Sequence, residues 1–180
     1  MLFNRTIGFA VVVAGLAAAA PAQVVINEVC ADNGSLVSAA GTLPDYVELY
    51  NSGTSSVALA GWTLTDDVTK PTKWAFPSDA TIAGKAHLVI WLDITNNYPG
   101  LITTSFSLRS SGEEVGLFQV STQRDYIRFG PQIPDRTLCR YPSGGTNWTL
   151  GLQTPGATNV NVALGTPLAL RINEIMATNS

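Results

Sequence analysis

The chain has 180 residues, a formal net charge of −3, and only 13% charged residues. Once a leader is removed, this length suits one domain with a full core and is short for two ordinary domains. No basic stripe is present, so a nucleic-acid partner is not expected.

The first 22 residues have the three parts of a secretory signal peptide. Arg5 is followed by an apolar run from Ile7 to Ala20 and by an Ala-x-Ala ending at Ala22. This run is shorter than the roughly 20 residues that span a bilayer. We therefore predict a signal peptide over residues 1–22, cleavage after Ala22, and an extracellular or cell-surface location. No transmembrane segment is expected in the mature chain.

Short β-strands separated by turn-forming residues are predicted for the rest of the chain. The first is Val24 to Cys30, a β-branched run bounded by turn signals. Its polar pair, Asn27 and Glu28, interrupts the apolar pattern. We therefore expect this pair at a sheet edge or at a strand end.

The second predicted strand, residues 45–51, alternates in polarity. Val47 and Leu49 face one side, and Glu48 faces the other with its tyrosine neighbours. A loop of turn formers follows, and Trp62 then begins the third strand with a large apolar anchor. Val47, Leu49 and Trp62 are predicted to lie in the core.

The remaining pattern predicts an all-β sandwich of about nine short strands. Residues 86–92 are apolar on both faces, which indicates a central strand. Apart from the leader, no segment has helical periodicity over more than about two turns. The later strands are expected near residues 73–77, 86–92, 101–108, 114–120, 125–129 and 136–141.

The end of the chain repeats its mature beginning at an offset of 146 residues. Residues 170–180 match residues 24–34. This repeat predicts a sandwich over residues 23–159, a linker over 160–169 and the truncated start of a second repeat at 170–180. In the alternative interpretation, the last strand pairs onto the first domain. The identical positions of the second copy are Ile172, Asn173, Glu174, Ala177 and Asn179.

In this order, the sequence pieces resemble the lamin-tail domain in its bacterial exported form. The resemblance covers about Val24 to Asn159. It rests on the ordered set INEV, DYVELYN, LAGWTLTDD, KWAFP, TIAGKAHLVIW, SGEEVGLF, PDRTLCRYPSG and NWTLGLQTPGATN. It implies an immunoglobulin-like β-sandwich that serves as an interaction module, without catalytic residues. The chain has no heptad rod and no nuclear-localisation cluster, so the chromatin role of the nuclear branch is not carried over.

The sequence offers little support for catalysis or cofactor binding. Its one histidine, His87, lies in the middle of the most apolar strand, where a structural role is expected. Cys30 and Cys139 lack the neighbours that activate a thiol, and no phosphate-binding motif is present. The two cysteines either form a disulfide in the exported protein or remain as buried free thiols. No catalytic, cofactor-binding or metal-binding residue is predicted.

Five carboxylates flank the first three strands and raise the hypothesis of a weak calcium site. Their spacing matches no calcium-loop pattern, so we expect solvated strand ends and cross-strand pairs with Lys or Arg. Two acids flanking a glycoside-hydrolase cleft are not expected in a small sandwich without long loops. The five are Glu28, Asp45, Glu48, Asp66 and Asp67.

The aromatic residues are expected mainly in the core, with a sugar-stacking platform as the alternative. They are Tyr46, Trp62, Trp74, Trp91 and Trp148. The predicted function is a non-catalytic exported module for adhesion, spacing or attachment of neighbouring domains in a larger surface or secreted protein. Its expected partners are a protein or polysaccharide on the cell surface and further domains of the same chain. The alternative is a carbohydrate-binding accessory module of a secreted hydrolase or nuclease whose catalytic domain lies outside this chain.

Overall fold

The computed structural model describes residues 23–93 and 100–165, and in these residues every regular element is a β-strand. The predicted leader (1–22) and second repeat (170–180) lie outside the described residues. Within them, no helix is long and apolar enough to cross a membrane. The strands are β1 (Val24–Cys30), β2 (Asp45–Asn51), β3 (Val57–Ala58), β4 (Trp62–Thr65), β5 (Trp74–Ala75), β6 (Thr81–Ile82), β7 (His87–Leu92), β8 (Ile102–Thr103), β9 (Glu113–Gln119), β10 (Thr122–Phe129), β11 (Thr137–Arg140) and β12 (Trp148–Gly151).

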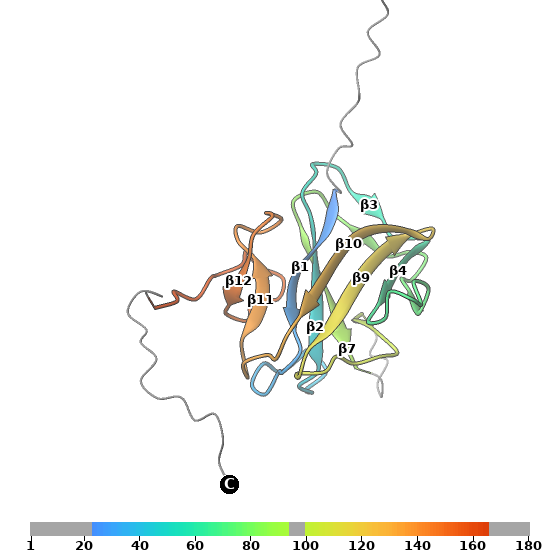
Figure 1. The fold of residues 1–180 in the computed structure, drawn as a ribbon. Coiled ribbons are helices and arrows are strands. Elements are labelled where there is room, and N and C mark those ends of the chain that lie inside the picture. Colours follow the sequence, from blue (N-terminus) through green and yellow to red (C-terminus); the bar gives the residue numbers. More distant parts are fainter. Residues whose placement is uncertain (1–22, 94–99, 166–180) are drawn as a thin grey trace, which may run out of the picture.

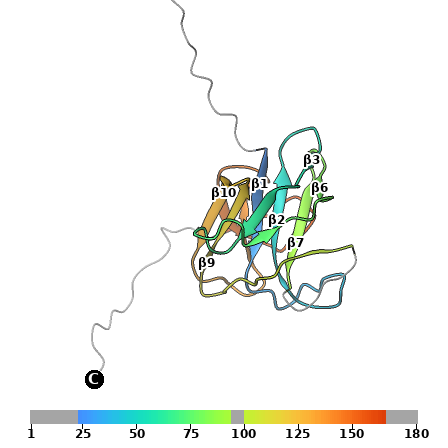
Figure 2. The same cartoon turned by 90° about the vertical axis from the view of Figure 1, so that its right-hand side faces the viewer.

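The strands form two main layers, as expected for a sandwich (Figure 1). The larger sheet has the order β12-β11-β1-β2-β7-β8, and the smaller has the order β10-β9-β4-β5. All pairs are antiparallel except β7 with β8. A separate two-stranded ribbon, β3 with β6, lies at the end of the molecule where β1 begins (Figures 1 and 2).

The core between the sheets follows from the period-two alternation of the strands. Val47 and Leu49 of β2 are fully buried against the smaller sheet, where Leu64 and Leu117 meet them in the same cluster. Trp62 is also buried in this cluster. The predicted core positions of Val47, Leu49 and Trp62 are confirmed.

The position of the Asn27–Glu28 pair was wrongly predicted. β1 lies inside the larger sheet, between β11 and β2, and both side chains have no solvent exposure. A register shift between Ile26 and Glu28 marks a β-bulge, in which Asn27 is the extra residue. The polar pair therefore marks an irregularity within a central strand.

Two charged side chains bind the backbone beside this bulge. Asp125 Oδ2 accepts the N–H of Ile26 at 2.7 Å, and Arg140 Nε donates to the Ile26 carbonyl at 2.7 Å. Arg140 also holds both oxygens of Asp125, at 2.9 and 3.0 Å. This pair satisfies the backbone groups of Ile26 and links β10 of the smaller sheet to β1 and β11 of the larger one.

Beyond β1, the larger sheet extends past the smaller one. β11 and β12 lie to the side of β10 in Figure 1, with no strand of the smaller sheet covering them there. The chain then returns along β12, where Leu152 N donates to Val160 O at 2.9 Å and Val162 N to Leu150 O at 2.8 Å. Residues 160–162, at the beginning of the expected linker, thus lie as an extra strand on this sheet.

Candidate functional site

Two of the five predicted carboxylates meet on the outer face of the larger sheet. Glu28 of β1 and Glu48 of β2 are direct partners in the antiparallel register, so their side chains project to the same side. Both have zero solvent exposure. They were expected as solvated or surface groups, and this prediction was wrong because a later segment of the chain covers them.

The covering segment, residues 152–159, is called the strap. Thr154 donates to Glu28 twice, from its backbone N–H at 2.9 Å and from its hydroxyl at 2.6 Å. The N–H of Gly156 donates to Glu48 Oε2 at 2.6 Å. The Tyr46 hydroxyl supplies a further hydrogen bond to Glu28. Backbone N–H groups of the strap therefore bind both carboxylates, which holds the strap on the sheet.

Two asparagines complete the network. Asn27 Nδ2 donates to Glu48 Oε1 at 2.8 Å and to Asn159 Oδ1 at 3.2 Å. Asn159 Nδ2 donates to the carbonyls of Asn27 and Arg140, at 3.0 and 2.7 Å. The Asn27 side chain also accepts the N–H of Gly144 at 2.8 Å. Each of these groups is buried or partly buried, so the network connects β1, β2, β11 and both C-terminal loops.

Burial raises the pKa of Glu48 to about 8. The hydrogen bonds from Asn27 and Gly156 oppose this rise, and the nearby charge of Glu28 adds to it. Glu48 therefore retains its proton to a large extent at neutral pH.

The two cysteines are free thiols on the same outer face. Cys139 of β11 pairs directly with Glu28 of β1, and Cys30 lies two residues after Glu28 on β1. Both thiols are therefore neighbours of the Glu28 side chain on this face. Burial raises the pKa of each thiol to about 11. Gln153 of the strap donates to Cys30 Sγ at 3.4 Å. The free-thiol alternative holds, and both groups lack the low pKa of reactive cysteines.

The other three carboxylates lie apart from this pair. Asp66 pairs with Lys73 at 2.5 Å and Asp67 with Lys70 at 2.9 Å, just beyond β4 in the smaller sheet. Asp45 is half-buried and accepts the Asn33 N–H at 3.1 Å, and burial raises its pKa to about 6. The structure does not bring the five acids together. No group of three metal-ligating side chains occurs within residues 23–93 and 100–165.

The aromatic side chains do not form a common exposed row. Tyr46, Trp62 and Trp91 are buried, and Trp91 contacts Tyr46 edge-on on the outer face of the larger sheet. Trp74 is half-buried beside Phe76 in the smaller sheet, and half-buried Trp148 stacks under Arg140 with 4.7 Å from its ring centroid to the guanidinium carbon. These positions match the expected core and edge roles.

His87 is partly exposed, as expected for a structural histidine, but it is the first residue of β7 and does not lie in the middle of a strand. It is half-buried on β7, and its ring centroid is 4.7 Å from that of Tyr50 on β2. Burial lowers its pKa. No described residue bonds to its Nε2, and no hydroxyl or thiol of the described chain makes a hydrogen bond to it.

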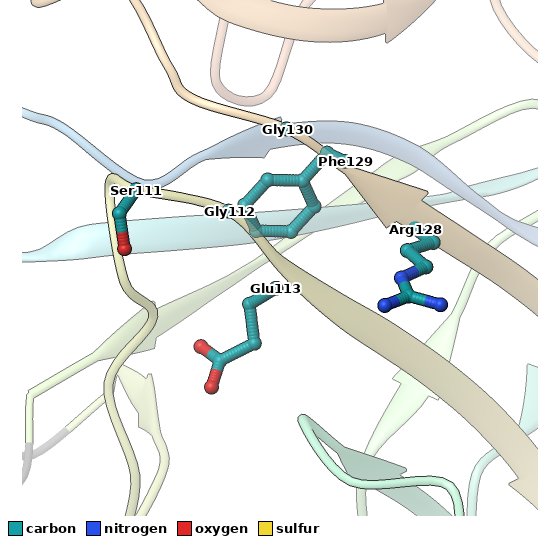
Figure 3. Close-up of a pocket in the computed structure, with 6 residues that line it drawn as sticks. All are labelled: Ser111, Gly112, Glu113, Arg128, Phe129 and Gly130. Atoms are coloured by element: carbon teal, nitrogen blue, oxygen red, sulfur yellow. The ribbon is translucent and has the colours of Figure 1, made fainter.

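A surface hollow of about 500 Å³ lies at the end of the β9–β10 pair. Figure 3 shows the side chains of Ser111, Glu113 and Arg128 spaced around the ring of Phe129. Glu113 Oε2 is already bound by the N–H of Arg109 at 3.0 Å. The hollow is open and its charged groups are not enclosed, so it lacks the converging buried groups of a ligand pocket.

The model of one protein family, the Lamin Tail Domain, matches residues 17–130. The chain belongs to the lamin tail domain family. The resemblance inferred from the ordered strand motifs is thus confirmed, and so is the all-β, immunoglobulin-like sandwich. No curated protein sequence matches the chain. The family match ends at Gly130, whereas β11, β12 and the strap of this lamin-tail domain come after it.

Sequence reasoning missed the structural importance of Asn27, Thr154, Gly156 and Asn159. The last three come from segments that the sequence presents as turns. One available signal was the repeat, because Asn27 and Glu28 recur identically as Asn173 and Glu174 inside an otherwise apolar strand. A polar pair retained in such a strand indicates buried partners.

Proposed function

We propose that this lamin-tail domain is a non-catalytic, exported module for adhesion, spacing or attachment of neighbouring domains in a larger surface or secreted protein. One observation carries the proposal: the most reactive side chains of the domain are enclosed and have structural roles. Glu28, Glu48, Cys30 and Cys139 are enclosed on one sheet face, where the carboxylates hold the strap. A catalytic centre needs such groups to reach a substrate.

The proposed location and partners come from the sequence. The leader at residues 1–22 supports export to the cell surface or the extracellular space. The repeat at 170–180 supports further domains of the same kind in the same polypeptide. A surface protein or polysaccharide is the proposed external partner. The sparse and slightly negative charge gives no electrostatic attraction to nucleic acid.

The carbohydrate-binding alternative receives less support. Sugar-binding faces present aromatic rings to solvent, whereas Trp62 and Trp91 are buried and Trp74 and Trp148 belong to different sheets. A glycan array tests this alternative directly. Saturable binding to a defined glycan that is lost in Trp74→Ala or Trp148→Ala would replace the first proposal with this one.

A reporter fusion tests the main proposal. The whole chain is fused to the N-terminus of a reporter enzyme, and reporter activity is measured in the cell-surface, medium and cytoplasmic fractions. We expect the reporter outside the cytoplasm and attached to the surface, and we expect deletion of residues 1–22 to retain it inside. A reporter that remains cytoplasmic with the leader present contradicts export. A hydrolytic activity of the purified chain that is lost in Glu28→Gln contradicts the non-catalytic role.

A further inference from the structure

The part of the larger sheet that extends beyond the smaller sheet is wider than β11 and β12 alone. Asn161 bridges to Gly151 in antiparallel fashion, and the flanking residues are hydrogen-bonded through Leu152 N to Val160 O and Val162 N to Leu150 O. Three neighbouring strands, β11, β12 and residues 160–162, therefore form a continuous extension of the sheet. Because successive side chains alternate along a strand, the extension has two distinct faces.

The side facing the core layer carries Arg140 and Trp148 at one end and aliphatic residues over the rest. Leu138 pairs with Val29 of the core and with Leu150 of β12, so these residues share that side. By alternation, Leu152 projects to the same side as Leu150. Val160 lies opposite Leu152 and Val162 lies opposite Leu150, so both valines also project to this side. The other side carries small or polar residues. We call the aliphatic part of the core-facing side the overhang face; its residues are Leu138, Leu150, Leu152, Val160 and Val162, with Ile133 beside them.

The overhang face is open to solvent. The exposed fractions of Leu152, Val160 and Ile133 are 41%, 46% and 54%. A hollow of about 230 Å³ separates this face from the end of β10, and Leu138, Leu150 and Ile133 line it. A free sheet face of adjacent aliphatic side chains is the kind of surface that another protein surface covers, because burying it removes apolar area from water.

The repeat at the end of the chain indicates what covers this face. The repeated positions in the first copy all have fixed structural roles. Ile26 and Ala31 are in the core, Asn27 and Glu28 bind the strap network, and Asn33 bonds Leu36 and Pro44 to close the following loop. Residues 170–180 therefore carry the side chains needed for the first strand of a complete sandwich.

The same repeated residues make it unfavourable for residues 170–180 to bind the overhang face as a single extra strand. Asn173 and Glu174 correspond to side chains that have no solvent exposure and are bound from every side in the first copy. Against a face of leucines and valines they would have no such partners, and burying them unpaired costs free energy. A second sandwich provides its own strap for this pair.

The connection between the two copies is short. Seven residues, 163–169, separate the strand at 160–162 from Leu170, the counterpart of Val24. Fully extended, they reach about 25 Å. A sandwich that begins at Leu170 must therefore begin close to the edge from which residues 160–162 leave, and the overhang face lies within that reach.

We propose that the overhang face docks a second lamin-tail sandwich of the same polypeptide, the one that residues 170–180 begin. This proposal rests on the proposed role in arrays of neighbouring domains. It names the surface through which consecutive copies contact each other. Docking buries Leu152, Val160 and Ile133 and closes the hollow beside β10.

The test uses the chain with its second copy completed. Ser180 aligns with Gly34, so residues 35–165 are appended after Ser180 to give a two-copy chain. Residues 35–165 then occur twice, so the appended copy is labelled with 15N by segmental ligation to separate its peptides from those of the first copy by mass. Hydrogen exchange by mass spectrometry is compared with that of residues 1–180 at the first-copy peptides covering 131–138 and 150–162. We expect at least fivefold slower exchange in the two-copy chain, together with a compact scattering profile that fits one rigid particle.

The face variant is Leu152→Gln with Val160→Gln in the first copy, and the matched control is Val37→Gln with Leu43→Gln. Val37 and Leu43 are exposed aliphatic residues in the loop between β1 and β2, at 57% and 46%. We expect the face variant to abolish the protection and to expand the particle, and the control to change neither. Circular dichroism of both variants in residues 1–180 checks that the first domain folds.

Three outcomes would overturn the proposal. Equal exchange in the one-copy and two-copy chains means that the copies do not dock through this face. Concentration-dependent protection in residues 1–180 that the face variant removes assigns the face to a second molecule. Protection in monomeric 1–180 that disappears on deleting 166–180 assigns it to that segment. The reporter fusion measures export and attachment separately, so failed docking leaves that role standing.

Discussion

The two sides of the larger sheet reverse the usual relation between polarity and burial. On the outer side, over β1 and β2, two carboxylates and an asparagine are fully enclosed beneath the strap. On the overhang face, Leu152 and Val160 remain exposed to solvent, beside Ile133. The difference comes from which chain segment covers each side. A buried polar cluster is therefore a sign of a dedicated covering segment, and the exposed aliphatic face is where the proposed second domain would dock.

The largest expected effect tests the polar side of this comparison. Asn27→Ala removes the partner of Glu48, Asn159 and Gly144 at once. Leaving these buried groups unpaired should lower the free energy of unfolding by about 3–5 kcal/mol. Urea unfolding followed by tryptophan fluorescence measures the change.

The matched control for that substitution is Asn161→Ala. Asn161 is an exposed residue of the strand at 160–162, and its side chain takes no part in the network. We expect a change within about 0.5 kcal/mol. If both alanine variants are equally destabilised, the enclosed network is not what holds the strap.

The second effect concerns pH. Because the folded protein holds the pKa of Glu48 at about 8, above its ordinary value of 4.5, it keeps a proton that the unfolded chain has lost between these values. Stability should therefore fall as pH rises through this window, by up to about 1.4 kcal/mol per pH unit. Asp45 acts in the same direction up to about pH 6, and His87, whose pKa burial lowers below its ordinary value of 6.5, acts in the opposite direction up to that value. The interval from about pH 7 to 8 therefore isolates Glu48.

Glu48→Gln should flatten the slope of unfolding free energy between about pH 7 and 8. The glutamine side chain keeps only one acceptor oxygen, so one of the two N–H donors that bind the carboxylate loses its partner. Asp67→Asn is the control, because hydrogen bonding to Thr69 and the charge of Lys70 lower the pKa of Asp67 to about 2. That substitution should alter only the acid limb, below about pH 4. A slope that persists in Glu48→Gln would remove Glu48 as its source.

The third effect concerns the strap itself. Thr154→Val removes the hydroxyl that donates to Glu28 at 2.6 Å and keeps the shape and the backbone N–H. Losing one hydrogen bond to an enclosed carboxylate should cost about 1.5–3 kcal/mol. Thermal unfolding compares it with Thr158→Val, an exposed position of the same strap. Equal midpoints in the two variants would argue against a structural role of this bond.

The smallest effect tests the apolar side. In residues 1–180, Leu152→Gln should change the free energy of unfolding by less than about 0.5 kcal/mol, because the side chain is already 41% exposed. The fully buried Leu49 provides the contrast, since Leu49→Ala should cost about 2–5 kcal/mol. Chemical denaturation of both variants gives the comparison. A large cost at Leu152 would mean that this face is already covered within the single copy.

The sequence was sufficient for most of the strands because their alternation is strong. β1 and β2 occur over the predicted residues, and the orientation of Val47 and Leu49 opposite Glu48 is as expected. β3, β6 and β12 were not predicted as separate strands, since two or four residues between turn formers give too short a pattern. The structure also contains more strands than the nine expected.

The enclosed carboxylates could not be predicted from local pattern. Glu28 is bound by Thr154, which is 126 positions away, and Glu48 by Gly156, which is 108 positions away. A strand pattern gives the face of a residue but not what later packs over that face. For this reason the predicted orientation of Glu48 was right and its predicted solvent exposure was wrong.

The strap also has a mechanical consequence. The described domain begins at β1 and ends after the strand at 160–162, and both belong to the same sheet. A force applied to the two ends of the described domain would first detach residues 152–162 from the sheet, because this segment is its C-terminal end and residues 160–162 are bonded to β12 at the edge of the sheet. That release would add up to about 35 Å of reach before any core strand is disturbed. In single-molecule pulling we expect one short extension step before the main rupture, which would make the strap a reserve of length at the C-terminal end of the described domain.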